Sequence, residues 1–291
     1  MERFTTTLPF PIPQLTYDEG EYLYLMLDGS QINELDKIIL MQDSYAEYEA
    51  IYLYEPWCGL RAVSPFIVQA TPKMQQWFMQ HNNPTHGYFF SSSQPLEHLA
   101  EHFRKFIQVE SPYGSRVFFK IGASEAAAVL FKTQNTAIWC DITTVWLPTR
   151  LGWIELTTPL QRDDLSSSQL LIKLTEEQWA LLGDVQWLNI LESLQHHIEK
   201  WFPHLISTHT PNTISWIDSW ASLAYRKGFV LEQDLLYYSN IIGLLGEDFA
   251  LQNEYHEVNT LLTTPSLQTH SQRVEQAAHI AHRLKNKSNP L

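Results

Sequence analysis

The hydrophobic pattern of the 291-residue chain changes its period part-way along, and this change limits the folds open to it. In the first 160 residues, short apolar runs of strand length alternate with stretches of helical period. From Thr175 onward only the helical period remains. Alternation of this kind is typical of helices packed on a sheet. The pattern therefore predicts a two-lobed α+β fold, with an N-terminal mixed α/β lobe over 1–160 and an all-helical C-terminal lobe over 161–291.

Local signals place the expected elements within each lobe. Tyr22 to Leu27 is an apolar run of strand length that ends in the turn pair Asp28-Gly29. The other strands are predicted over 64–69, 88–90, 116–121 and parts of 137–160, and the helices of this lobe over 31–41, 73–80, 94–108 and 124–132. The polar segment 161–169 is the predicted boundary between the lobes.

Capping and stop signals mark the helices of the second lobe. Thr175 followed three residues later by Gln178 is a capping-box pattern, and it opens a long amphipathic helix that Pro203 stops near Trp201. Further helices are predicted over 214–227, 232–245, 249–262 and 272–285.

Acidic residues outnumber basic ones by 32 to 19, and most of the excess lies at the N-terminus. Residues 1–60 hold eleven acidic and two basic residues, which gives −9 of the total net charge of −13. Phosphates are held chiefly by Lys and Arg, so the composition excludes a general binder of nucleic acid or anionic membrane. The acidic stretch is either a docking face for a basic partner or an aid to solubility.

The chain carries the marks of a cytoplasmic protein. Cys58 and Cys140 are its only cysteines, too few for a disulfide framework. The first fifteen residues contain three prolines and no apolar signal-peptide segment. No apolar run reaches the ~18–20 residues of a membrane span.

One motif suggests metal chemistry. Residues 98–102 have the H-x-x-E-H spelling of the inverted zincin metallopeptidases and fall within a predicted helix. On a helix His98 and His102 share one face, so they could bind one Zn²⁺ with Glu101 as general base. In the competing interpretation, both histidines simply lie on the wetter flank of that helix. A zinc-dependent hydrolase is therefore the alternative function.

Tryptophans offer the best candidate for a partner site. Trp139, Trp146 and Trp153 fall seven residues apart, near the junction of the predicted lobes. Because aromatic residues are enriched in interface hot spots, we predict that these three contact a partner, with packing in the sheet core as the alternative. No phosphate-binding loop or nucleophile motif accompanies them, so we expect a non-enzymatic chain without cofactor or metal.

The order of several short motifs resembles the adaptor and chaperone family of bacterial type VI secretion, the Tap or Tec proteins encoded beside VgrG spike genes. The strand and turn over 22–29 are similar to that family's "YALLDGA". Residues 63–68 and 87–92 are similar to its "xxPYLV" and "WGLLLS" strands, and the helix over 96–106 resembles "LxxHLRxxL". His102-Phe103-Arg104 stands in the "HLR" positions. The resemblance therefore explains part of the zincin-like spelling without metal.

The resemblance extends over about residues 20–265, with one departure. After the strand over 117–119 the family typically reads "RFYDPR", whereas this chain reads Lys120-Ile121-Gly122-Ala123-Ser124. If that turn contacts a partner in other members of the family, the contacts of this chain must differ there. In the second lobe, residues 225–229 and 244–249 resemble the family's "AxxxGI … LGxxF".

The resemblance implies a non-enzymatic role in the cytoplasm. The chain would bind the N-terminal region of a cognate effector and help to load it onto the VgrG spike protein. A toxin or immunity protein of the same gene neighbourhood is a further alternative.

Overall fold

The structure is a computed structural model that describes residues 11–81, 83–159, 171–209 and 211–288. The chain divides into two compact units, Met1–Val185 and Gln186–Leu291. The division falls inside the long helix α5 (Glu176–Trp201). The boundary predicted from the polar segment 161–169 lies outside the described residues.

A six-stranded antiparallel sheet forms the centre of the first unit. Its strands lie in the order β2-β3-β1-β4-β7-β8. Their bounds are β1 Tyr22–Leu27, β2 Tyr48–Ala50, β3 Phe66–Gln69, β4 Gly87–Ser92, β7 Thr144–Thr149 and β8 Gly152–Thr157. The central strand β1 pairs with β3 on one side and β4 on the other.

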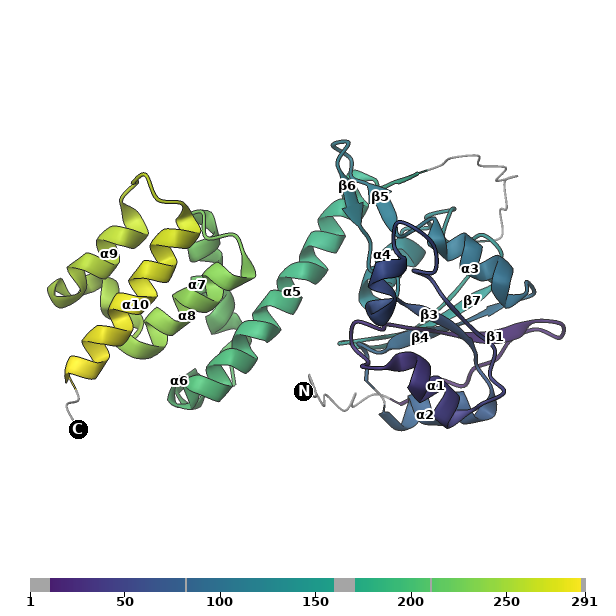
Figure 1. The fold of residues 1–291 in the computed structure, drawn as a ribbon. Helices are drawn as coiled ribbons and strands as arrows, with labels where there is room; N and C mark the ends of the chain where they lie inside the picture. The colour runs from purple at the N-terminus through teal and green to yellow at the C-terminus, as the bar shows by residue number, and fades with distance from the viewer. Residues whose placement is uncertain (1–10, 82, 160–170, 210, 289–291) are drawn as a thin grey trace. The chain divides into compact units, whose positions relative to one another are not determined.

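Helices cover both faces of this sheet (Figure 1). Helices α1 (Leu35–Gln42) and α2 (Pro72–His81) lie on one face, and α3 (Leu96–Arg104) and α4 (Ser124–Lys132) on the other. Leu25 packs in the core on the α1–α2 side and Met26 in the core on the α3–α4 side. Because β1 is buried on both faces, it reads as a continuous apolar run and not as an alternating one.

A second, three-stranded sheet completes the first unit. Strand β5 (Gln108–Glu110) pairs antiparallel with β6 (Arg116–Phe118) and parallel with β9 (Ile172–Lys173). The 3₁₀ helix η1 (Cys58–Val63) precedes β3.

The second unit is helical. It contains the rest of α5 and the elements α6 Pro203–His209, α7 Thr213–Arg226, α8 Glu232–Leu245, η2 Glu247–Leu251, η3 Asn253–Tyr255, α9 His256–Thr263 and α10 His270–Ser288. Its core joins these helices through residues such as Leu194, Ile217, Ile241 and Ala277, all with no exposed surface.

The predicted fold class is confirmed: an N-terminal sheet with packed helices is followed by a helical region. The capping box is confirmed as well, because Gln178 N–H donates to Thr175 Oγ1 at 3.1 Å and Thr175 N–H donates to Gln178 Oε1 at 3.0 Å. The predicted ranges 31–41, 94–108 and 249–262 each include residues outside the helix that forms there. Helix α3 ends at Arg104 because the chain turns there into β5.

Candidate partner-binding surface

Three of the motif segments meet at the turn that follows β1. A Cβ atom on Gly29 would lie 2.1 Å from the carbonyl oxygen of Ser64. A Cβ on Gly122 would lie 3.1 Å from Cα of Asp28 and 3.3 Å from Cβ of Pro65. Only glycine permits this approach at position 29, and a Cβ at 122 would force its neighbours to shift. The turn after β1, the start of β3 and the segment that departs from the family pattern therefore pack as one corner.

Asp28 orders this corner with a buried carboxylate. Its Oδ1 accepts the backbone N–H of Ser30 at 2.9 Å, which makes an Asx-type turn. Burial raises the pKa of Asp28, against the lowering effects of the hydrogen bonds from Ser30 and of the charge on Lys120. Lys120 belongs to the departing segment, so this segment still supplies a positive charge near the turn.

Arg104 fixes the neighbouring chain segment through its guanidinium group. Nη2 donates to the carboxylate of Glu49 at 2.8 Å and to the carbonyl oxygen of Ala50 at 2.9 Å, and Nη1 donates to Glu101 at 2.6 Å. Its Cζ lies 4.8 Å from the ring centroid of Tyr54, an exposed side chain. Since the guanidinium is largely buried and its hydrogen bonds are charge-assisted, it holds the residues after β2 in place.

An apolar surface follows directly after this segment. Side chains three residues apart on a 3₁₀ helix lie on one face, which aligns Trp57, Leu60 and Val63 along η1. Leu60 and Val63 are 44% and 45% exposed. Phe118 of β6 is 45% exposed, and its ring meets that of Trp57 edge-on with 4.8 Å between centroids. These four residues form what we call the aromatic strip.

The strip is backed by rigid structure. Tyr52 is buried, and its ring contacts Phe118 edge-on at 6.0 Å between centroids. Trp57 packs against the core on the α3–α4 side of the sheet. Exposed apolar side chains that touch one another on a fixed scaffold are typical of protein interaction sites.

Of the three tryptophans predicted to contact a partner, two are buried in the interior of the first unit. Trp139 and Trp146 are 6% and 0% exposed, and they belong to the cores on opposite faces of the sheet. Trp139 Nε1 donates to the carbonyl oxygen of Phe131 at 3.1 Å. Trp153 is partly exposed and stacks on Phe89. The structure therefore does not bring the three rings to one surface, and their role in partner binding stays a prediction.

The H-x-x-E-H residues have separate partners. His98 is exposed and its Nε2 lies 3.0 Å from a carboxylate oxygen of Asp141, while Glu101 pairs with Arg104. His102 is buried, which corrects the prediction that it lies on the wetter flank. Among the described residues, no group of three or more His, Cys, Asp or Glu side chains is placed to hold a metal ion.

Burial explains the lowered pKa of His102. Its ring meets those of Phe103 and Phe106 at 5.3 and 5.5 Å between centroids, because the chain after α3 folds back over it. Burial, together with the charge on Lys105, lowers the pKa of His102 to about 4. A neutral ring in this setting serves packing, and its Nε2 is buried without a hydrogen-bond partner in the described part of the chain.

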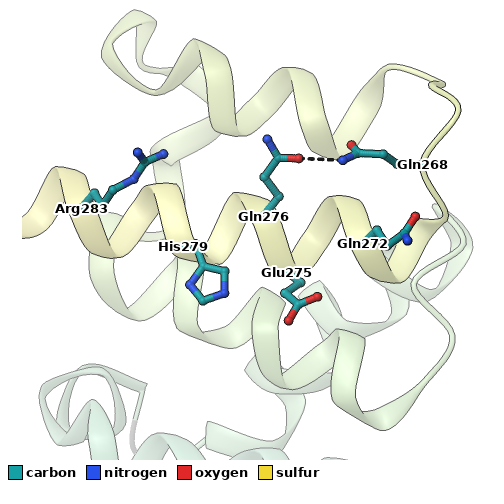
Figure 2. Close-up of a pocket in the computed structure, with 6 residues that line it drawn as sticks. All are labelled: Gln268, Gln272, Glu275, Gln276, His279 and Arg283. Carbon is teal, nitrogen blue, oxygen red and sulfur yellow. Dashed lines mark hydrogen bonds between the residues drawn. The ribbon is translucent and has the colours of Figure 1, made fainter.

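The second unit has a shallow polar hollow along α10 (Figure 2). Its volume is about 360 Å³ and it is lined by Gln268, Gln272, Glu275, Gln276, His279 and Arg283. Gln268 donates to Gln276 at 2.9 Å, and Tyr237 donates to Glu275 at 3.2 Å. The lining is exposed and polar, so it lacks the apolar walls of a typical ligand pocket.

The aromatic strip was not predicted from the sequence. Its signal is the spacing of Trp57, Leu60 and Val63, which is the period of a 3₁₀ helix and not that of a strand or an α-helix. Phe118 belongs to an apolar run, which by itself predicts only a strand.

Two comparisons place the chain among known proteins. Residues 23–140 match the model of a family described as a domain of unknown function, DUF4123. The chain is 40% identical over 274 residues to the "Accessory protein VasW" of Vibrio cholerae serotype O1 (strain ATCC 39315 / El Tor Inaba N16961), which covers 93% of this chain and 91% of the relative. No solved structure matches the chain. None of the helices in the described part of the chain is long and apolar enough to cross a membrane.

The family match lies within the first unit and contains Arg104, the turn after β1 and the whole aromatic strip. The order of motifs predicted membership of the type VI adaptor family. The 40% identity across nearly the full length of both proteins and the matched domain support this prediction. The chain belongs to the Tap/Tec-like adaptor family of bacterial type VI secretion.

Proposed function

We propose that the chain is a non-enzymatic adaptor that binds the N-terminal region of one cognate type VI effector in the cytoplasm and helps to load it onto VgrG. Family membership and the name of the relative, an accessory protein, support a role beside the secretion machinery and not in catalysis. In this proposal the effector contacts the aromatic strip.

The observation that carries the proposal is the edge-on contact of Phe118 with Trp57, in line with exposed Leu60 and Val63. This strip offers apolar area without a catalytic group, which suits the temporary holding of an apolar peptide segment. Arg104 contacts Tyr54, three residues before Trp57, and so supports the segment that leads into the strip.

Co-purification tests the proposal directly. The tagged full chain is co-expressed with each protein encoded beside it, and we expect a stable complex with one effector and capture of VgrG. The double variant Leu60→Asp/Phe118→Asp should lose the effector, because two carboxylates would be buried without partners in the contact. Circular dichroism verifies that the variant is folded.

A matched control keeps the result specific to the strip. Leu251 is 83% exposed in the second unit, outside the family match, so Leu251→Asp should leave effector capture unchanged. Failure to capture any neighbouring effector or spike protein would contradict the adaptor function. Capture that survives the double variant would instead move the effector site away from the strip.

A further inference from the structure

Helix α1 exposes a second apolar face, on the side away from the core. Leu35 and Ile39 are buried against the sheet. Leu40, Met41 and Tyr45, on the opposite side and just past its end, are 47%, 81% and 88% exposed. Three large apolar side chains are thus exposed within six residues, and exposed apolar patches mark interaction sites. We call these three residues the α1 face.

The turn that carries Tyr45 is fixed. The carboxylate of Asp43 accepts a hydrogen bond from Thr71 Oγ1 at 2.8 Å and from the backbone N–H of Tyr45 at 3.2 Å, and Lys73 Nζ lies 3.7 Å away. The Asp43 N–H in turn donates to the carbonyl oxygen of Ile39 at 2.9 Å. Tyr45 therefore projects from an ordered turn, so a partner would not have to order it on binding.

Acidic residues outnumber basic ones in the segment that carries the α1 face. Residues 11–60 contain ten acidic residues and one basic residue, Lys37. Among the described residues, Glu34 pairs with Lys37, Asp43 with Lys73 and Glu49 with Arg104. Asp36 lies in the first turn of α1, and Glu47 follows Tyr45 by two residues. The local field would attract a positively charged partner and repel an anionic one.

We propose that the α1 face docks an amphipathic helical segment of a secretion partner, with an apolar stripe flanked by Lys and Arg residues. The choice of partner rests on the adaptor function proposed above. Charge argues against two other occupants: an anionic membrane would be repelled, and a second copy would bring identical acidic faces together. A helical partner suits this face because Leu40 and Met41 project from helix α1, and side chains of one helix pack into the grooves of another, while Tyr45 adds an apolar contact from the turn that follows.

The α1 face and the aromatic strip are independent surfaces. Trp57 packs with the core on the α3–α4 side of the sheet, whereas α1 packs with the core on the other side. The two surfaces can therefore be altered separately, and an adaptor with two partners needs two surfaces.

A synthetic peptide probes the α1 face without knowledge of the natural partner. The probe is a fluorescent 18-residue amphipathic helix of Leu and Lys, and its control is a peptide of the same composition with scrambled order. Fluorescence anisotropy with the full chain should show binding of the amphipathic probe only. Met41→Ser/Tyr45→Ser should weaken it about tenfold, since an interface depends on its few central apolar residues. Affinity should also fall as salt rises.

The matched control removes two exposed apolar side chains elsewhere. Leu251→Ser/Leu267→Ser, both highly exposed in the second unit, leaves the net charge unchanged and should bind the probe like the natural chain. Equal binding by Met41→Ser/Tyr45→Ser and the natural chain, or equal binding of the scrambled peptide, would overturn the proposal.

Co-purification separates this inference from the adaptor function. If Met41→Ser/Tyr45→Ser retains both effector and VgrG while Leu60→Asp/Phe118→Asp loses the effector, the α1 face is not a docking site and the adaptor function stands. If no neighbouring protein is captured but the probe binds as described, the α1 face stands as a docking site and the adaptor function fails.

Discussion

The guanidinium of Arg104 donates to the carbonyl oxygen of Ala50 at 2.9 Å, and this bond occupies a carbonyl at the edge of strand β2. Among the described residues, strand β2 is the last strand of the six-stranded sheet on that side, so no strand of this part of the chain pairs with its outer carbonyls. A cation placed on such an edge discourages pairing with another chain. The same side chain contacts Tyr54, so one residue both occupies this edge carbonyl and holds the segment that leads into the aromatic strip.

We predict that Arg104→Lys lowers the free energy of unfolding by about 2 kcal/mol. Lysine keeps the charge but cannot reach Glu49, Glu101 and Ala50 at once with a planar fork, so buried acceptors lose their donors. Urea unfolding followed by circular dichroism measures the loss. Arg116→Lys, at an exposed site on β6, is the control and should change stability by less than about 0.5 kcal/mol. Equal effects of the two variants would refute the role of Arg104.

Gly29→Ala should destabilise the first unit by about 3 kcal/mol or more, because its methyl group would lie 2.1 Å from the Ser64 carbonyl oxygen and backbone must move to relieve the clash. Thermal unfolding measures the change. Gly59→Ala provides the comparison, since nothing lies within 4 Å of its added Cβ, and we expect a change within about 0.5 kcal/mol. A Gly29→Ala protein of unchanged stability would show that the turn at Gly29 can move away from Ser64 without cost.

Much of the fold followed from hydrophobic period and capping. Helix α4 begins at Ser124 and ends at Lys132, and α8 begins at Glu232 and ends at Leu245, as predicted. Helix α6 was not predicted, because Pro203 is a stop signal for α5; proline also suits the first turn of a helix, and α6 begins there. Strands β2, β5 and β9 have two or three residues, too few to show a period.

The candidate site was harder to predict than the fold. Arg104 stands in a recognisable motif, but its partners Glu49 and Ala50 lie more than fifty residues away in sequence. Such contacts depend on how β2 and α3 pack, which no local pattern encodes. Trp139 and Trp146 are large aromatic residues, yet size and aromaticity serve a core as well as an interface.

Asp28→Asn should stabilise the chain more at neutral pH than at acidic pH. Burial raises the native pKa of Asp28 above its unfolded value, so the natural chain loses stability as pH rises through that native pKa. Asparagine stays neutral and its oxygen can still accept the N–H of Ser30. Urea unfolding of both proteins at about pH 4 and pH 8 gives the difference in free energy of unfolding, which should move in favour of the Asp28→Asn variant as pH rises. A difference independent of pH would contradict a buried carboxyl with a raised pKa.

The buried ring of His102 should make the first unit sensitive to acid. Burial lowers its pKa from 6.5 to about 4. Between these two pH values, His102 is therefore protonated in the unfolded chain and neutral in the native chain. Stability is therefore full above about pH 6.5 and is lost as pH falls toward 4, by up to about 3 kcal/mol.

His102→Gln tests this directly, because glutamine does not titrate and keeps a polar side chain at this position. The variant loses some packing against Phe103 and Phe106 at all pH values, so the informative quantity is the slope of unfolding free energy against pH, measured with urea between about pH 4.5 and 7.5. We expect a flatter slope for His102→Gln than for the natural chain. His204→Gln, at an exposed site on α6, controls for the removal of one histidine and should keep the natural slope. If both variants give the natural slope, His102 can be protonated in the native protein without loss of stability, which contradicts its burial.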